Sequence, residues 1–165
     1  MILTAIKSAI LRCTGVVVQE VFASTDSVAV EMVDLVNEVA TDIMKSRDWR
    51  ALTSVAEIVG TGVEAYDLPK DYNRMEITTD IDDKAQWFWG YKPFDTVNDW
   101  MRFKAGGGGI SQPGGWIMLG GQLQFYPAPS GTAQFPYVSN LYAKSASGEV
   151  KAAFTADTDI FRLNE

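Results

Sequence analysis

The sequence predicts an α+β fold in which the N-terminal helices of a helical bundle carry an inserted antiparallel β domain made of hairpins. Apolar residues recur at helical spacing over residues 2–43, and after Trp49 short β-branched and aromatic runs alternate with glycine and proline. We therefore expect a helical part at residues 1–50 and a β-rich lobe at residues 51–153. A C-terminal segment at residues 154–165 returns to the helical part.

Two helices are predicted at the start of the chain. One apolar stripe runs from Ile2 to Cys13, and Gly15 provides a natural helix stop. Because Cys13 lies on this stripe, we expect it to be a buried small hydrophobic residue. The second helix has N-cap candidates at residues 24–27, and its stripe is typical of an ordinary core helix. The apolar positions of that stripe are Val28, Met32, Leu35, Val36, Val39, Ala40 and Ile43. Residues 16–22, between the helices, are either extended or a connecting loop.

The β-rich lobe is predicted as a series of short strands. Its most definite element is a hairpin whose strands, residues 116–119 and 122–126, flank Gly120-Gly121 in a two-residue primed turn. Pro127-Ala128-Pro129 ends this hairpin. The other expected strands are residues 55–59, 77–79, 137–142 and 150–154.

Residues 95–115 interrupt the strands. Asp95 is the expected cap of a short helix that carries Val97, Trp100 and Met101 on one side. Residues 104–115 then form a glycine-rich mobile loop, which contains a run of glycines at 106–109. A phosphate-binding loop is rejected, because no Lys-Ser/Thr pair follows the glycines and no hydrophobic strand precedes them.

Aromatic residues gather in the lobe. Trp87, Trp89 and Tyr91 occupy alternate positions, which indicates an aromatic ladder on one face of a strand. With Trp100 and Trp116 they form the core of the lobe, a surface for a protein partner or a stacking platform for a ligand. A core is the interpretation that best fits a small β domain, and the other two alternatives stay open.

Composition excludes several kinds of chemistry. The net charge of −7 argues against a nucleic-acid clamp. The chain has no histidine and one cysteine, which excludes histidine-based catalysis, internal disulfides and multi-cysteine zinc sites. Residues 80–83 are interpreted as a solvated hairpin turn, and Asp157 with Asp159 as a helix cap, rather than as metal sites. We therefore expect no enzyme activity, no catalytic residue, no metal and no cofactor. We also expect no membrane partner, because no signal peptide and no run of about 18 apolar residues occurs.

An ordered series of short motifs runs through the chain. It comprises Trp49-x-x-Leu52, Tyr66-x-Leu68-Pro69-x-Asp71 with Arg74, Trp116 with Gly120-Gly121, Pro127-Ala128-Pro129, Phe135-x-Tyr137-x-Ser139 and the run from Phe154 to Asp159. In its order and spacing the series resembles the head-to-tail connector (adaptor) proteins of tailed bacteriophages. Members of that family usually continue into C-terminal helices, so the resemblance implies that these helices are missing or truncated here.

The resemblance implies a mechanical role in the virion. Such adaptors are assembled in the host cytoplasm and form a ring, here expected to be dodecameric, at the neck between the portal protein and the tail. The ring of neighbouring adaptor subunits extends the DNA conduit without specific binding of the genome, and it docks the next tail or nozzle protein. The acidic balance of this chain fits a lumen that repels phosphates.

Two segments are expected to contact other polypeptides. The candidate contact residues are Gly106, Gly107, Gly108, Gly109, Ile110, Phe154, Asp157, Asp159, Phe161 and Leu163. The alternative function is a β-rich binding module that holds a carbohydrate or a receptor on an aromatic face.

Overall fold

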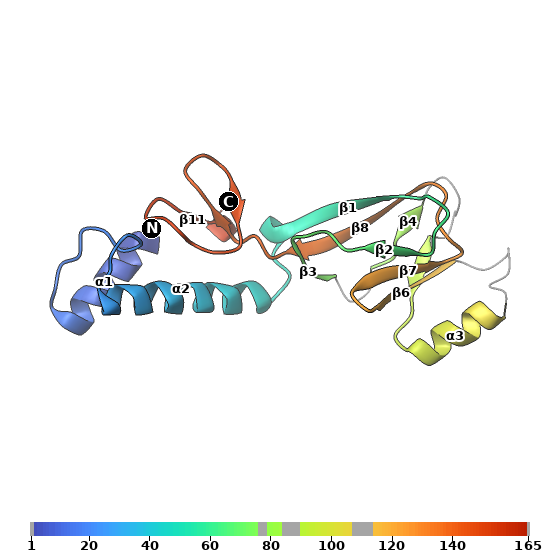
Figure 1. Cartoon of the computed structure of the whole chain (residues 1–165), viewed down its shortest axis with the longest axis horizontal. Coiled ribbons are helices and arrows are strands. Elements are labelled where there is room, and N and C mark those ends of the chain that lie inside the picture. Colours follow the sequence, from blue (N-terminus) through green and yellow to red (C-terminus); the bar gives the residue numbers. More distant parts are fainter. Residues whose placement is uncertain (1, 76–78, 84–89, 107–113, 165) are drawn as a thin grey trace. The chain divides into compact units, whose positions relative to one another are not determined.

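The computed structural model describes residues 2–75, 79–83, 90–106 and 114–164, and it divides the chain into two compact units (Figure 1). The terminal unit contains Met1–Thr53 and Ser139–Glu165, and the central unit contains Ser54–Val138. Helices and mixed sheets together confirm the predicted α+β class. The second boundary lies at Val138 rather than at residue 153, because the strands that follow it pair with the C-terminal segment.

The first helix, α1 (Ile2–Thr14), ends as predicted. Gly15 has a φ of 73°, and its N–H donates to the carbonyl of Leu11 at 2.9 Å. The prediction of a buried Cys13 is wrong, since this residue is exposed. Only Ile6 and Ile10 of α1 are buried, because the covered face of the helix ends before its last turn.

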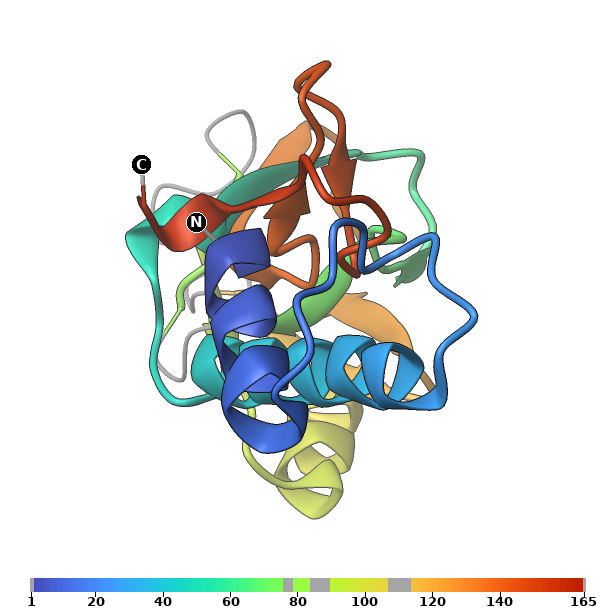
Figure 2. The ribbon, with the colours of Figure 1, turned by 90° about the vertical axis from the view of Figure 1, so that its left-hand side faces the viewer.

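The second helix, α2 (Ser27–Lys45), begins at the N-cap Asp26, whose carboxylate accepts from the backbone N–H groups of Val28 and Ala29. Figure 2 shows α1 crossing α2. Ile6 and Ile10 pack with Ala29 and with Val21 of the connecting segment, which contains no strand. The local fold of this unit therefore depends on a small apolar cluster between two helices.

The C-terminal half of the terminal unit is a small sheet followed by a turn of 3₁₀ helix. Its elements are β9 (Ala143–Lys144), β10 (Val150–Lys151), β11 (Ile160–Phe161) and η2 (Arg162–Asn164), and η2 lies against η1 (Arg50–Leu52). The strand order is β10-β9-β11, with both pairs antiparallel. The prediction of a helix capped by Asp157 and Asp159 is wrong, because these residues belong to a turn that leads into β11.

Within its described residues, the central unit contains two sheets and one helix. Its elements are β1 (Thr53–Val59), β2 (Ala65–Asp67), β3 (Tyr72–Met75), β4 (Asp82–Asp83), β5 (Tyr91–Pro93), α3 (Val97–Ala105), β6 (Gly114–Leu119), β7 (Gln122–Tyr126) and β8 (Thr132–Ser139). One sheet has the order β1-β8-β3, with β4 also paired to β8, and the other has the order β2-β7-β6-β5. The strand expected at 137–142 instead begins at Thr132 and ends at Ser139. Of the strand expected at 77–79, Thr79 is not in a strand and the other positions lie outside the described residues.

The predicted hairpin is confirmed in β6 and β7. Gly120 and Gly121 both have positive φ, 62° and 79°, between the paired residues Leu119 and Gln122. A two-residue turn of this kind needs glycine, because both positions lie in the left-handed region. Side chains of β6 and β7 then enter a core of buried residues. That core includes Ile58, Ile81, Tyr91, Trp116, Leu123, Phe125, Ala133, Phe135 and Tyr137.

The helix α3 begins one residue later than predicted. Thr96, rather than Asp95, is the N-cap, and its hydroxyl accepts from the N–H of Asp99 at 3.1 Å. Of the glycine-rich loop expected at 104–115, Lys104 and Ala105 instead belong to α3, Gly114 and Gly115 belong to β6, and positions 107–113 lie outside the described residues. Of all the described helices, none is both long enough and apolar enough to cross a membrane.

Candidate protein-contact site

An apolar groove of about 390 Å³ lies in the terminal unit, and we call it the α1–α2 groove. Helices α1 and α2 form most of its walls, and two phenylalanines of the C-terminal segment complete it. The residues that define it best are Ile2, Ala5, Ala9, Leu35, Val39, Ile43, Phe154 and Phe161. All of these side chains are apolar, so the groove offers no group for proton transfer or metal binding.

The α2 wall of the groove is open to solvent. Leu35, Val39 and Ile43 are 48%, 46% and 38% exposed, although each belongs to the stripe that the sequence assigned to the core. They are four residues apart, so they form one ridge along the helix. Of the predicted stripe only Ala40 is buried, and the other buried residues of α2 are Ala29 and Met44. The helix thus has a packed face and a second apolar face that the terminal unit leaves open.

Acidic residues border this open face. At 100° per residue, Glu31, Glu38 and Asp42 fall beside Leu35 on the side away from the buried face of α2. All three are exposed, and none forms an ion pair with any residue in the part of the chain that the structure describes. The α1–α2 groove therefore combines an apolar floor with a negatively charged edge.

Aromatic packing fixes the C-terminal wall of the groove. Phe154 and Phe161 meet edge-to-face with ring centroids 5.9 Å apart, and Tyr142 packs on both at 5.3 and 6.0 Å. Asn37 of α2 holds this wall from inside the unit. Its Oδ1 accepts from Phe154 N at 2.8 Å and from the Tyr142 hydroxyl at 3.0 Å, and its Nδ2 donates to Phe154 O at 3.3 Å.

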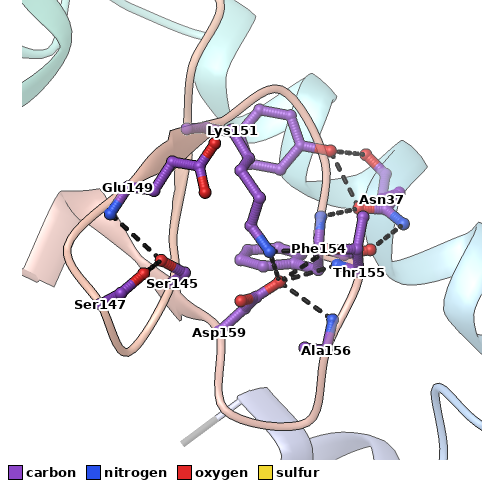
Figure 3. A network of polar contacts seen from close by, with 10 residues as sticks. Asn37, Ser145, Ser147, Glu149, Lys151, Phe154, Thr155, Ala156 and Asp159 are labelled. Atoms are coloured by element: carbon purple, nitrogen blue, oxygen red, sulfur yellow. Dashed lines mark hydrogen bonds and ion pairs between the residues drawn. The ribbon is translucent and has the colours of Figure 1, made fainter.

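A buried carboxylate orders the loop that follows Phe154 (Figure 3). Asp159 is 3% exposed, and its Oδ2 accepts from Lys151 Nζ at 2.6 Å, Thr155 N at 2.7 Å and Ala156 N at 3.0 Å. Burial alone would raise the pKa of Asp159, but the hydrogen bonds from Lys151, Thr155 and Ala156 outweigh it and lower the pKa. The carboxylate is therefore a structural anion that fixes the turn beside the groove.

Asp157, the second carboxylate of this segment, also accepts hydrogen bonds from backbone N–H groups, but these belong to the loop between α1 and α2. Asp157 accepts from the backbone N–H groups of Val21 and Phe22 at 3.2 to 3.4 Å, which ties the C-terminal segment to the loop between α1 and α2. Both aspartates thus accept from loop amides, and neither caps a helix as predicted. Among the described residues no group of three potential ligands lies close enough to hold a metal ion.

The candidate contact residues fall in different places. Phe154 and Phe161 line the α1–α2 groove, while Leu163 is half-buried in η2. Gly106 ends α3 in the central unit, and residues 107–110 lie outside the described residues. The exposed apolar face of α2 is not among the sequence-based predictions. The sequence does carry a signal for this face, because the apolar positions of α2 cover a wider arc of the helix than one packed face requires.

The aromatic residues predicted to form a core, a partner surface or a ligand platform are buried in the central unit wherever the structure describes them. Tyr91, Trp100 and Trp116 are all buried, so these three do not offer ring faces to a ligand. Trp87 and Trp89 lie outside the described residues. Residues 80–83 also differ from a simple solvated turn, because Asp80 pairs with Lys92, Ile81 is fully buried and Asp82–Asp83 form β4.

Comparison with known proteins places the chain in a family. A search of curated proteins gives no match. The sequence profile described as SU10 adaptor protein matches residues 2–162, which includes both units and both walls of the α1–α2 groove. The predicted resemblance to bacteriophage head-to-tail adaptors is confirmed by this match, and the chain belongs to the SU10 adaptor protein family.

Proposed function

We propose that this protein is a structural component of the virion neck that assembles as a ring between the portal protein and the tail. The observation that carries the proposal is the family match over residues 2–162. The α1–α2 groove supports it, because an open apolar face of this kind is typical of a surface that another polypeptide covers. The ring is dodecameric and meets the portal on one side and the next tail or nozzle protein on the other.

The proposed ring acts by contact and not by catalysis. The sequence contains no histidine, and the buried carboxylate of Asp159 and the half-buried carboxylate of Asp157 accept from backbone amides and, for Asp159, from Lys151. Conformational stability and fit to neighbours are then the properties on which function depends. The genome passes through the ring without specific binding, and the net charge of −7 favours a lumen that repels phosphates.

The position in the particle is tested by removing the protein. Phage particles made without this chain are expected to fill their heads with DNA but to lack attached tails, and supplying the full chain restores tails. Electron microscopy of restored particles locates the protein at the neck as a ring. Tailed particles that form and infect normally without the chain would refute the proposal, and so would density for it outside the neck.

Binding to the portal provides a second, independent test. The full chain is mixed with the portal ring of the same phage and analysed by sedimentation and by electron microscopy. A twelvefold adaptor ring on one end of the portal supports the proposal. The same images test the charge of the side chains that line the lumen. A lumen lined by lysine and arginine side chains would contradict the proposal that the lumen repels DNA phosphates.

A further inference from the structure

We propose that the α1–α2 groove of one copy receives the exposed ridge of α3 from a second copy. This inference rests on the proposed ring and names the two surfaces through which neighbouring subunits meet. The groove belongs to the terminal unit, and α3 belongs to the central unit. The contact therefore joins two different surfaces of identical chains, which is the arrangement that a closed ring requires.

The α3 ridge is a row of exposed apolar side chains along one side of α3 in the central unit. Val97 and Met101 are 48% and 64% exposed, and Ala105 continues the same row one turn later. The opposite side of α3 is held in the unit, where Trp100 is buried and Phe103 packs on Phe94 with ring centroids 4.9 Å apart. Aromatic packing thus fixes the direction in which the ridge points.

The dimensions of the ridge and the groove agree. A helix rises about 1.5 Å per residue, so the nine-residue α3 is about 14 Å long. The part of α2 that lines the groove, from Met32 to Ile43, spans about 17 Å on the same rise. Apolar residues at four-residue spacing are the anchors by which a helix occupies a groove between two other helices. The ridge therefore fits within the length of the groove.

The charges beside the two surfaces are opposite. The groove is bordered by Glu31, Glu38 and Asp42, whereas Arg102 and Lys104 flank the ridge. Within its own chain Arg102 meets Asp99 only at 4.0 Å with its side chain 76% exposed, whereas Lys104 is held by Glu64 in a partly buried pair. An exposed pair such as Arg102–Asp99 contributes little, so Arg102 can turn to an acidic partner. The matching signs favour this occupant over an acidic one.

The contact is tested by crosslinking between chains that each carry one cysteine. The background is Cys13→Ser, because Cys13 is exposed. Chains with Val39→Cys and differently tagged chains with Met101→Cys are mixed, assembled with the portal ring and treated with a short bismaleimide. The matched control replaces the second chain by Val55→Cys, which lies in the same unit and is equally exposed, at 64%. Because each chain has one cysteine, any mixed product joins two copies.

A mixed Val39→Cys and Met101→Cys product at several times the yield of the Val55→Cys control supports the inference. Rings that form on the portal but give no such excess overturn it and leave the proposed function standing. If none of the chains binds the portal, the proposed function is refuted instead.

Charge reversal provides a second readout with the same crosslink. Glu38→Lys or Arg102→Glu alone is expected to lower the yield by about two- to fivefold, as for an exposed ion pair. The two reversals together are expected to restore it. If the crosslink yield of the double reversal equals the product of the two single reductions, Glu38 and Arg102 do not interact directly, which would contradict the inference.

Discussion

Removing the Asp159 carboxylate is expected to destabilise the terminal unit by about 3–5 kcal/mol, the usual cost of breaking a buried charged pair from one side. In Asp159→Ala, one oxygen that accepts three hydrogen bonds of 2.6 to 3.0 Å is lost. The Lys151 ammonium is then left with its side chain only 21% exposed, although it keeps its bond to the Thr155 hydroxyl. The two backbone N–H groups lose their acceptor, and the turn beside Phe154 loses the anion that orders it.

Urea unfolding followed by circular dichroism at the helical minimum measures this effect. The signal reports mainly the terminal unit, because α1 and α2 have 13 and 19 residues whereas α3 has nine. With an m-value of about 1–3 kcal/mol/M, the expected loss lowers the midpoint by on the order of 2 M. The control is Asp42→Ala, an exposed carboxylate for which we expect a change within about 0.5 kcal/mol.

Two results would refute the reasoning. The first is an Asp159→Ala midpoint as close to the wild type as that of Asp42→Ala. If Asp159→Ala does not fold, the conservative Asp159→Asn is used with amide hydrogen exchange as the readout. Faster exchange at Thr155 and Ala156 than in the wild type is expected, because their acceptor becomes a neutral amide. Unchanged exchange at both amides would be the second refuting result.

Three further predictions concern pH, a buried hydroxyl and a crowded glycine. Because the folded-state pKa of Asp159 is lowered, its stabilisation is present above the unfolded pKa of about 3.9 and is lost as pH falls through the folded value. The urea midpoints of wild type and Asp159→Asn should therefore converge as the pH falls below about 3.9, and a constant gap contradicts this. Tyr137→Phe removes the 2.8 Å bond to Asp71 and should cost the central unit about 1 kcal/mol in tryptophan-monitored unfolding. Since burial, followed by Asp71, raises the pKa of Tyr137, absorbance titration of the variant should lose a late-ionising tyrosine. Gly114→Ala places a Cβ 2.6 Å from the Tyr91 ring and should cost about 1–3 kcal/mol, whereas Gly106→Ala, which places a Cβ 3.4 Å from the Arg102 carbonyl oxygen, should cost much less; equal effects would contradict the crowding argument.

Local chemistry explains what the sequence predicted correctly. The β6–β7 hairpin follows from two adjacent glycines between alternating strands, and this signal needs no knowledge of the rest of the fold. The start of α2 at Asp26 follows in the same way from a carboxylate that accepts from the next two or three N–H groups. Both elements are specified by neighbours in the chain, so a single sequence is enough to find them.

The wrong predictions depend on contacts between residues far apart in the chain. Asp157 and Asp159 have the residue type and spacing of a helix cap, but the amides they bind belong to loops, one of them 136 residues away. A carboxylate accepts from a loop amide as readily as from a helical one, so the residue type alone cannot distinguish the two. The prediction that Cys13 and Leu35 lie in the core is wrong for a related reason. Periodicity identifies an apolar face but does not say whether another element covers it.

The exposed face of α2 and the α3 ridge together indicate how strong a contact between two copies can be. Leu35, Val39, Ile43, Val97 and Met101 expose apolar surface equal to roughly two and a half whole side chains, and burying it would contribute about 4–7 kcal/mol. Association of two free proteins costs about 4–15 kcal/mol in lost motional freedom, so this contact alone does not hold two copies together firmly. We therefore expect the free chain to be mainly monomeric at micromolar concentration. On a portal ring the neighbouring subunits are already held side by side, because binding to the portal has removed most of their translational and rotational freedom. The contact between the groove and the ridge is then sufficient to join adjacent subunits. Sedimentation of the free chain tests this step, because a stable ring without portal would mean that the subunits share a larger interface than the groove and the ridge.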